Sequence, residues 1–493
     1  MHRRNFLKSA ALVASAPYLT VLPGVTTSAG ESPTAWKLGW RSVDVDSFAP
    51  LPLSIDGEIP ADVVGTLYRN GPAKLERAGV RYKHWFDGDG MIQQFRITPD
   101  SIVHQGKFVA TTKYVEEEAA GQFLYSGAGT ELPATQGWRN NDSGNVANTA
   151  LLPFDGELLA LWEGGSAYRV DADTLQTLGR KDWSDELKHM PFSAHPLVDT
   201  EGTVWNVGSA TYSGGSGAIV VYRIDTAGEV VATELIKTPF AGYMHSFTMS
   251  ERHLIFYIGP HVFERGGSTF VNSFQWQPDR GSRLLVVEKD DLSSQRWFEA
   301  PSGFVFHCAN AYEQRGRIIA NMSLYEDAGI MDTAMFGLLD TSADAPTEYP
   351  QFPRAELATV ELDLTSGKVH VQSSGELLEF PGSDARLGYR AKAIFGTGHA
   401  PSERPTYSNA VVRIDPTTGK VNRAIFPDEH IVEEPLFVGG SSGNDWLVGT
   451  FLDLGREQTG VYVLDANNLA GGPVAMARME RALPLGFHGC FTG

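Results

Sequence analysis

The sequence has 493 residues, 42% of them hydrophobic, and a formal net charge of −19 at pH 7. This length allows two or three ordinary domains or one large closed β architecture. The acidic balance argues against DNA or RNA as a partner and against an electrostatic hold on anionic lipid, because both need a basic protein surface. An uncharged or apolar small molecule is the better-matched ligand.

Residues 1–29 are typical of an export signal rather than of a folded segment. Arg3 and Arg4 are followed by Phe6 and by an apolar stretch over residues 10–25, which is the layout of a secretory leader. The paired arginines resemble the twin-arginine signal, so we expect a bacterial protein that is exported to the periplasm after folding. A cytosolic amphipathic N-terminus is the alternative. No later apolar run in the sequence reaches the ~18–20 residues that a membrane-spanning helix needs.

A hairpin pattern recurs along the rest of the chain. An alternating apolar strand leads to an acidic residue, a turn rich in Thr, Gly or Asn, and a second strand. The six copies begin near Tyr168, Val221, Leu285, Val360, Val412 and Val461. Such alternation, broken by Asp and Gly, predicts β-hairpins, and copies spaced by roughly 50–75 residues predict the blades of a β-propeller.

Together with the strands around residues 65–70, these copies indicate about seven blades. We therefore expect residues 30–493 to form a single all-β domain, a seven-bladed β-propeller. A two-domain β-sandwich is the alternative. Helical segments are few: Val115–Ala120 is a short acidic candidate, and Ile330 to Leu339 is an apolar insertion. That insertion is either packed on the body of the protein or exposed as a patch for transient contact with a membrane or an apolar ligand.

Four of the 13 histidines stand in apolar contexts that are widely spaced along the chain, namely His195, His245, His307 and His488. A lone buried histidine is usually an ordinary core residue. However, the inner strands of a propeller converge on its axis, so histidines from different blades can meet there. Four neutral imidazoles without a Cys or Asp ligand would form a borderline site suited to Fe(II), Cu or Zn.

Three glutamates, Glu163, Glu379 and Glu434, also stand among apolar or small residues. A buried carboxylate is costly unless it is paired, and metal-bound imidazoles generally donate their second N–H to a carboxylate or carbonyl. These glutamates are therefore candidates for orienting the histidines. Surface glutamates on the edges of blades are the alternative. The two cysteines, Cys308 and Cys490, lie within two residues of candidate ligands; we favour two buried free thiols over a disulfide.

Taken together, these motifs resemble those of the carotenoid cleavage oxygenases, the family of apocarotenoid oxygenases, stilbene-cleaving oxygenases and the retinoid isomerase. The matching segments occur in the same order almost end to end. They are residues 65–72, 84–91, 147–149 and 158–165, the four histidine motifs, residues 379–381 and 434–438, and residues 486–489. The resemblance implies a seven-bladed propeller with a dome of loops and helices over an axial metal site.

The resemblance also implies the site residues. One Fe(II) per chain would be held by His195, His245, His307 and His488, with Glu163, Glu379 and Glu434 bonded to three of these histidines. Thr149 matches a catalytic threonine whose side chain crowds an open iron position. The match at Glu379 departs from the family in that Gly382 follows Glu-Phe-Pro. Residues 351–354 offer a rival match, but Gln351 could not supply the negative charge.

In this family the iron delivers both atoms of O2 across a C=C bond and yields two carbonyl products. We expect a small apolar substrate in an aromatic tunnel, and we expect a monomer or a weak dimer. The candidate substrate-binding residues are Phe86, Trp162, Tyr243, Phe304, Phe306 and Phe487.

Substrate choice depends on Trp162. In stilbene-cleaving relatives, a lysine that holds the substrate phenol precedes the first glutamate, and this chain has Trp162 there. The ring favours a carotenoid or apocarotenoid. A stilbene or phenylpropenoid such as isoeugenol is the second reading. Two other classes stay open: a non-catalytic periplasmic propeller that binds a ligand, and a zinc hydrolase, although four protein ligands are more typical of structural zinc.

Overall fold

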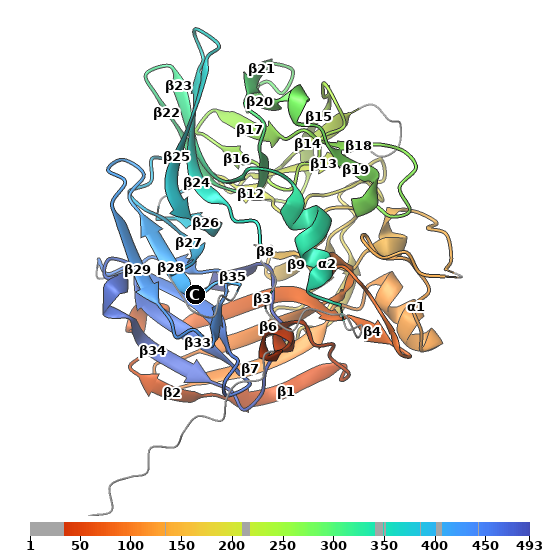
Figure 1. Cartoon of the computed structure of the whole chain (residues 1–493), viewed down its shortest axis with the longest axis vertical. Helices are drawn as coiled ribbons and strands as arrows, with labels where there is room; N and C mark the ends of the chain where they lie inside the picture. Colours follow the sequence, from red (N-terminus) through yellow and green to blue (C-terminus); the bar gives the residue numbers. More distant parts are fainter. Residues whose placement is uncertain are drawn as a thin grey trace, which may run out of the picture. The chain divides into compact units, whose positions relative to one another are not determined.

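Seven antiparallel sheets are arranged around a common centre in the computed structural model (Figure 1). The structure describes residues 34–493 except 134, 210–216, 341–348, 350, 351, 385, 401–406 and 442. Residues 33–493 belong to one compact unit. The predicted leader and Gln351 lie outside the described residues. Within the described part of the chain, no helix is both long and apolar enough to cross a membrane.

Each sheet is one blade of the propeller, and its strands are named from the centre of the ring outwards. Blade one is β35 (Gly489–Thr492), β3 (Gly65–Lys74), β6 (Asp89–Ile97), β7 (Ile102–Phe108) and β1 (Ser47–Pro52). Blade two is β8 (Ala150–Phe154), β9 (Glu157–Leu161), β10 (Tyr168–Val170) and β11 (Thr177–Arg180). Blade three is β12 (Leu197–Val198), β13 (Val204–Ser209), β14 (Ala218–Ile224) and β15 (Val230–Lys237).

Blade four is β16 (Thr248–Met249), β17 (His253–Ile258), β20 (Ser282–Glu288) and β21 (Gln295–Ala300). Blade five is β22 (Phe304–Gln314), β23 (Arg317–Tyr325), β24 (Glu356–Asp363) and β25 (Val369–Leu377). Blade six is β26 (Glu379–Ser383), β27 (Ile394–Gly398), β28 (Ala410–Ile414) and β29 (Val421–Ile425). Blade seven is β30 (His430–Val432) and β31 (Leu436–Val438), both paired with β32 (Trp446–Asp453), then β33 (Gln458–Asp465), β34 (Pro473–Arg478) and β2 (Ser54–Gly57).

The prediction of an all-β, seven-bladed propeller is confirmed. The six hairpins predicted from the sequence join the third and fourth strands of blades two to seven. Their recurring Asp fixes the turn: Asp363 Oδ1 accepts hydrogen bonds from the N–H groups of Thr365 and Ser366, at 2.9 and 2.8 Å. This is an Asx-turn, in which a short side chain replaces a backbone acceptor.

Strands from distant parts of the sequence close the ring at two places. β35 pairs with β3, with Arg69 opposite Gly489 and Thr66 opposite Thr492. β2 pairs with β34 at the outer edge of blade seven. Because β35 is the innermost strand of blade one, this closure also places residues 486–488 at the centre of the ring.

The helical elements are short. α1 (Thr112–Ala120) contains the predicted acidic segment; its N-cap Thr111 accepts from the N–H of Tyr114, and Gly121 ends the helix in the left-handed region at φ +64°. A π-helical turn at Ile330–Ala334 leads into α2 (Met335–Gly337). Turns of 3-10 helix lie at Ala35–Trp40, Ala61–Val63, Trp85–Asp87, Asn141–Gly144, Val271–Ser273, Pro278–Arg280 and Leu469–Gly471. Two hairpins outside the blades pair β4 (Glu76–Arg77) with β5 (Val80–Arg81) and β18 (His261–Phe263) with β19 (Phe274–Trp276).

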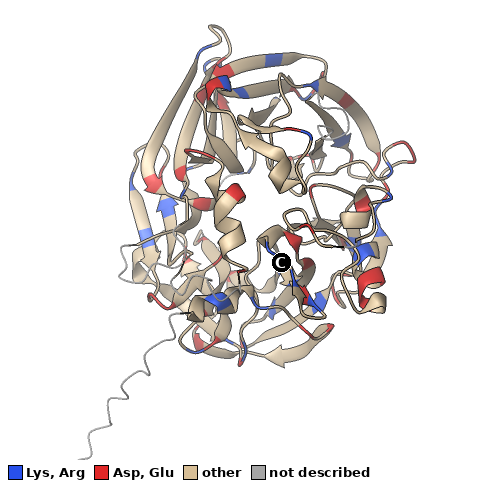
Figure 2. Ribbon diagram, turned by 45° about the vertical axis from the view of Figure 1, so that its right-hand side comes forward, with Lys and Arg blue, Asp and Glu red and all other residues tan. Residues whose placement is uncertain are grey.

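Of the two readings of the apolar insertion from Ile330 to Leu339, packing on the body of the protein is the one that the structure has, and the insertion is not an exposed patch. Ile330, Met331, Met335, Leu338 and Leu339 are at most 5% exposed, and α2 lies across the face of the ring (Figure 1). They pack in one buried cluster with the tryptophans of the first turn and with the aromatic residues of the centre. The segment is apolar because it forms part of the dome. Charged residues of both signs are interspersed around the outer parts of the ring (Figure 2).

Candidate metal centre

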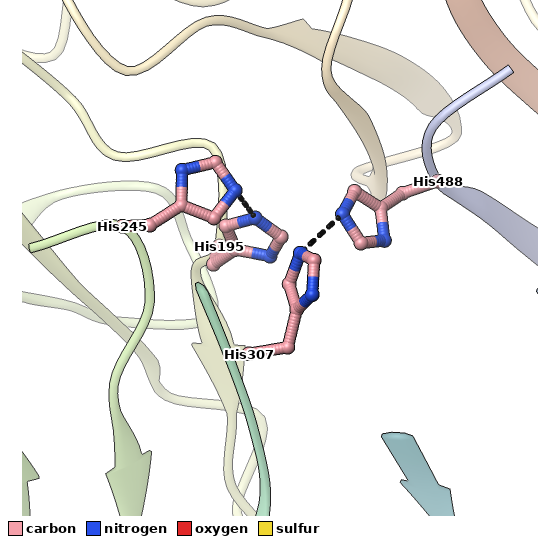
Figure 3. A group of neighbouring side chains, drawn as sticks. All are labelled: His195, His245, His307 and His488. Carbon is pink, nitrogen blue, oxygen red and sulfur yellow. Dashed lines mark hydrogen bonds between the residues drawn. The ribbon is translucent and has the colours of Figure 1, made fainter. Parts of the chain in front are cut away.

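The four predicted histidines converge at the centre of the ring from four different blades (Figure 3). His195, His245 and His488 come shortly before β12, β16 and β35, which are innermost strands, and His307 lies within β22. One nitrogen of each ring can be chosen so that all four lie within 4.8 Å of one another. His195 Nε2 is 2.9 Å from His245 Nε2, and His307 Nε2 is 3.0 Å from His488 Nε2.

The three predicted glutamates lie behind three of these rings. His245 Nδ1 is 2.7 Å from Glu163 Oε2, His307 Nδ1 is 2.6 Å from Glu379 Oε2, and His488 Nδ1 is 2.8 Å from Glu434 Oε1. A carboxylate can only accept, so each Nδ1 carries the proton and donates it. The Nε2 lone pairs are thereby directed towards the centre of the cluster.

This donor set fits a cation. In the pair His307 and His488, both Nδ1–H groups donate to carboxylates, so two Nε2 lone pairs face each other at 3.0 Å. Two lone pairs at that distance repel unless a cation lies between them. A separation of 3.0 Å is what neighbouring ligands of one ion show when each metal–nitrogen bond is about 2.1 Å.

Burial keeps the imidazoles in the form that binds metal. The pKa values of His195 and His488 lie well below the ordinary value, first because burial disfavours the charged ring and then because other histidines are close. Both rings are therefore neutral near pH 7, and neutral imidazole suits Fe, Zn and Cu.

Two β-bulges aim the side chains of blades five and six. The pairing of β22 with β23 gains an extra residue between Val305 and Cys308, and the pairing of β26 with β27 gains one between Glu379 and Gly382. In the second bulge Phe380 has φ +52°. A bulge bends the strand and redirects side chains. The bulge in β22 lets Phe306 and His307, which are adjacent in sequence, both reach the central cavity.

Glu434 and the segment before β35 are held by a group that the sequence did not single out. Arg69 of β3 donates to Glu434 Oε2 at 2.7 Å and to the carbonyl of Phe487 at 3.1 Å, and it is 3.5 Å from Glu433 Oε1. Glu434 Oε2 also accepts from the N–H of Gly489 at 2.8 Å. Arg69 is 3% exposed. The motif around residues 65–72 was recognised, but the role of its arginine depends on the distant pairing with β35.

A cavity of about 290 Å³ adjoins the histidines. Four predicted substrate-binding residues line it: Phe86, Trp162, Phe306 and Phe487. Thr149 also lines it; its hydroxyl donates to Asn148 Oδ1 at 3.0 Å, and its carbonyl accepts from the N–H of His488 at 3.2 Å. Lining residues that the sequence reasoning missed include Trp85, Trp138, Tyr325, Ile330, Met335, Phe380 and Tyr407.

Tyr243 and Phe304 are not among the residues that line this cavity, and their contact with substrate stays a prediction. The two rings stack on each other at 5.9 Å with an interplanar angle of 6°, and both are at most 3% exposed. Phe306, two residues along the strand, lines the cavity and meets Phe304 edge to face, with ring centroids 4.8 Å apart. The hydroxyl of Tyr243 is instead directed at Glu163.

Glu379 has two oxygens in different surroundings. Its Oε2 accepts from His307 and from the N–H of Phe380 at 2.7 Å, while Oε1 is buried and the carboxylate interacts there with the phenol of Tyr325. A side cavity of about 30 Å³ lies there, lined also by Tyr325, Thr397 and His399. That volume and those polar groups suffice for an ordered water.

Both cysteines are free thiols, as predicted. Burial raises the pKa of Cys308 and of Cys490 to about 12. Neither thiol is therefore ionised enough near neutral pH to compete with imidazole as a ligand.

The comparisons with known proteins agree with this geometry. The model of the retinal pigment epithelial membrane protein family matches residues 41–493. The chain is 30% identical to apocarotenoid-15,15'-oxygenase of Synechocystis, over 94% of this chain and 96% of that protein. It is 27% identical to isoeugenol monooxygenase of Pseudomonas putida, over 89% of this chain and 94% of that protein.

Similarity in structure extends over the same span. The crystal structure of cobalt-substituted Synechocystis ACO matches with a TM-score of 0.82 at 27% identity, covering 94% of this chain and 99% of that chain. The propeller, the four converging histidines and these matches lead to one conclusion: the chain belongs to the retinal pigment epithelial membrane protein family, the carotenoid cleavage oxygenases.

Proposed function

We propose that the protein is an Fe(II)-dependent oxygenase that cleaves a C=C bond of an apolar conjugated substrate with O2 and gives two carbonyl products. The substrate class that we propose is a carotenoid or apocarotenoid. One observation carries this proposal: four histidines converge on one point, and the three that are bonded to glutamates line a cavity with aromatic walls. His195, His245, His307 and His488 would hold one iron, which when bound supplies the site for O2 activation.

The protein's own contribution is to position the substrate and to exclude water. The rings of Phe86, Phe306 and Phe487 form a wall beside the histidines, with centroids 5.8 to 6.2 Å apart where they meet. Such rings bind an extended polyene by apolar contact, and a polyene that fills the cavity displaces water from it. Thr149 commits its hydroxyl proton to Asn148, so it does not offer that proton to a reacting oxygen.

The substrate proposal rests on Trp162. It is 9% exposed, lines the cavity beside Glu163, and meets Trp138 edge to face at 6.3 Å. This wall offers a polyene apolar surface, and none of the described residues that line the cavity is a lysine or arginine that could bind a phenol. The relatives include oxygenases named for apocarotenoids and for isoeugenol, so isoeugenol is the second substrate to test.

The test uses protein purified without oxygen and loaded with Fe(II). We expect iron near one per chain and O2-dependent loss of the visible absorption of an apocarotenal, with two aldehydes by mass spectrometry. His307→Ala is the metal-free control. Bound iron with cleavage of isoeugenol but not of the apocarotenal would support the phenylpropenoid reading. A fully folded protein that binds no iron would contradict the enzyme and leave a ligand-binding propeller.

We also propose that the protein reaches the periplasm through the twin-arginine pathway. Arg3, Arg4 and the apolar residues 10–25 support this proposal. Changing Arg3 and Arg4 together to Lys should leave the protein in the cytoplasmic fraction. Undiminished periplasmic protein in that variant would contradict the proposal.

A further inference from the structure

The phenol of Tyr243 is bonded to the carboxylate of Glu163. Its hydroxyl lies 3.1 Å from Oε1 and 3.0 Å from Oε2 of Glu163, and the same carboxylate accepts the Nδ1–H of His245 at 2.7 Å. We propose that Tyr243 is a positioning residue: it holds Glu163, and through Glu163 it holds His245, in the orientation that binds metal. This inference rests on the proposed role of His245 as a ligand.

Aromatic packing fixes the direction of the hydroxyl. The ring of Tyr243 is stacked on Phe304 with an interplanar angle of 6°, and the rings of Phe274 and Phe306 meet it edge-on at 5.5 and 6.3 Å. The main-chain N–H of Tyr243 donates to the carbonyl of His261 at 2.8 Å. A ring enclosed on several sides has one rotamer. The hydroxyl of Tyr243 is therefore already directed at Glu163 before metal binds, and metal binding costs this side chain no conformational entropy.

Glu163 has more need of this contact than the other glutamates. Its side chain is 21% exposed and forms part of the wall of the apolar cavity, where an unpaired carboxylate is costly. Glu434 is fixed by Arg69 and by the N–H of Gly489, and Glu379 by the N–H of Phe380. For Glu163 the phenol takes that place.

A neutral phenol also affects the charge of the site differently from an arginine. Arg69 partly neutralises Glu434, whereas Tyr243 orients Glu163 and leaves its full negative charge to act on His245. The phenol lies 3.2 Å from His245 Nδ1, but that nitrogen donates to Glu163, so the phenol proton goes to the carboxylate. A carboxylate held behind an imidazole raises its basicity and therefore its affinity for metal.

The direct test is the dissociation constant for Co(II) or Fe(II), measured by competition with a chelator in full-length protein. Tyr243→Phe removes only the hydroxyl, and we expect affinity to fall about 10-fold, at the low end of what the loss of an outer partner costs. Because Tyr243 does not line the cavity, KM for the substrate of the metal-loaded enzyme should not change. The matched control is Tyr257→Phe: Tyr257 is 5% exposed, bonds Ser282 at 2.7 Å and lies outside the centre.

A double-mutant cycle with Glu163→Gln separates positioning from a general loss of structure. If Tyr243 acts through Glu163, Tyr243→Phe should cost almost nothing in metal affinity in the Glu163→Gln background. Wild-type affinity in Tyr243→Phe, or an equal loss in both backgrounds, would overturn the inference. A wild-type protein that binds neither metal would instead overturn the proposed function on which it rests.

Discussion

Trp162 belongs to the aromatic wall of the cavity and directly precedes Glu163, the carboxylate that is bonded to His245. Replacing it by Lys would bring an ammonium to the cavity wall, where a phenol can use it as a charged hydrogen-bond partner. We expect Trp162→Lys to raise the ratio of turnover of a hydroxystilbene to that of an apocarotenal by about 10-fold, the worth of one such bond. The two rates should be measured side by side in metal-loaded protein.

Trp138 provides the control for this substitution. It lines the same cavity, contacts Trp162 edge to face, and is 45% exposed. A lysine at this position can turn towards solvent, so Trp138→Lys should not change the ratio. An unchanged ratio in Trp162→Lys would remove the physical basis for preferring a polyene over a phenol.

A second prediction at the residue scale concerns pH. Burial raises the pKa of Glu313, but hydrogen bonds from Arg252, His253 and Ser250 outweigh it and hold the pKa at about 2. The unfolded chain protonates this group at a higher pH, so the pairing stabilises the fold above pH ~4.5 and is lost as pH falls towards 2. Glu313→Gln should flatten the fall of the unfolding midpoint between these pH values. The exposed Glu299→Gln variant should not, and equal curves for wild type and Glu313→Gln would contradict the assignment.

Sequence reasoning found the residues whose chemistry contrasts with their surroundings. Histidines and glutamates among apolar neighbours stand out, because an apolar context gives them no reason to be there except pairing or metal. Tyr243 and Phe304 could not be placed in the same way. In the sequence, an aromatic residue next to a ligand looks the same whether or not it lines the cavity, and the three-dimensional arrangement, such as the bulge in β22 beside Phe306, decides it.

At the scale of elements, the pairing of β3 with β35 carries Arg69 to Glu434. Arg69→Met would leave Glu433 and Glu434 buried without their cation. Breaking a buried pair from one side typically costs 3–5 kcal/mol. We therefore expect a lower unfolding midpoint together with weaker metal binding, because Glu434 orients His488.

The comparison for this variant is Arg96→Met on the neighbouring strand β6. Arg96 pairs with Asp173 at 2.8 Å, but its side chain is 48% exposed, and surface pairs contribute about 0–1 kcal/mol. Both variants should be measured by thermal unfolding and by chelator competition. If Arg69→Met retained wild-type metal affinity, the contact with Glu434 would not support the ligand.

Elements differ in how well their sequences specify them. The hairpins could be predicted because their turns contain an Asp that accepts hydrogen bonds from later N–H groups, as Asp363 does from those two and three residues later. This arrangement gives a pattern that can be recognised in a short stretch of sequence. The location of Ile330 to Leu339 could not be, because a run of Met and Leu is compatible equally with a buried dome and with an exposed patch. Packing against residues such as Trp40 and Trp85, about 250 to 300 positions away in the sequence, decides it.

At the scale of the whole molecule, each of the seven blades contributes one residue to the centre. His488, His195, His245 and His307 come from blades one, three, four and five, and Glu163, Glu379 and Glu434 come from blades two, six and seven. A bound ion therefore links the entire ring, including the closure between β3 and β35. Metal binding and ring closure should then stabilise each other.

This linkage gives a final prediction. A ligand that binds only the folded state stabilises it by about 2.7 kcal/mol when its free concentration is 100 times Kd, so chelation should lower the unfolding midpoint and added Fe(II) should restore it. A variant that ends at His488 keeps all seven residues of the centre but lacks β35 and the N–H of Gly489 that holds Glu434. We expect this variant to bind metal more weakly, and we expect bound metal to raise its unfolding midpoint by less.

The control is a variant that lacks only Gly493, which lies outside the strand. The unfolding of both variants should be followed with and without metal. Equal gains in the two variants would show that the metal centre does not depend on the closure of the ring.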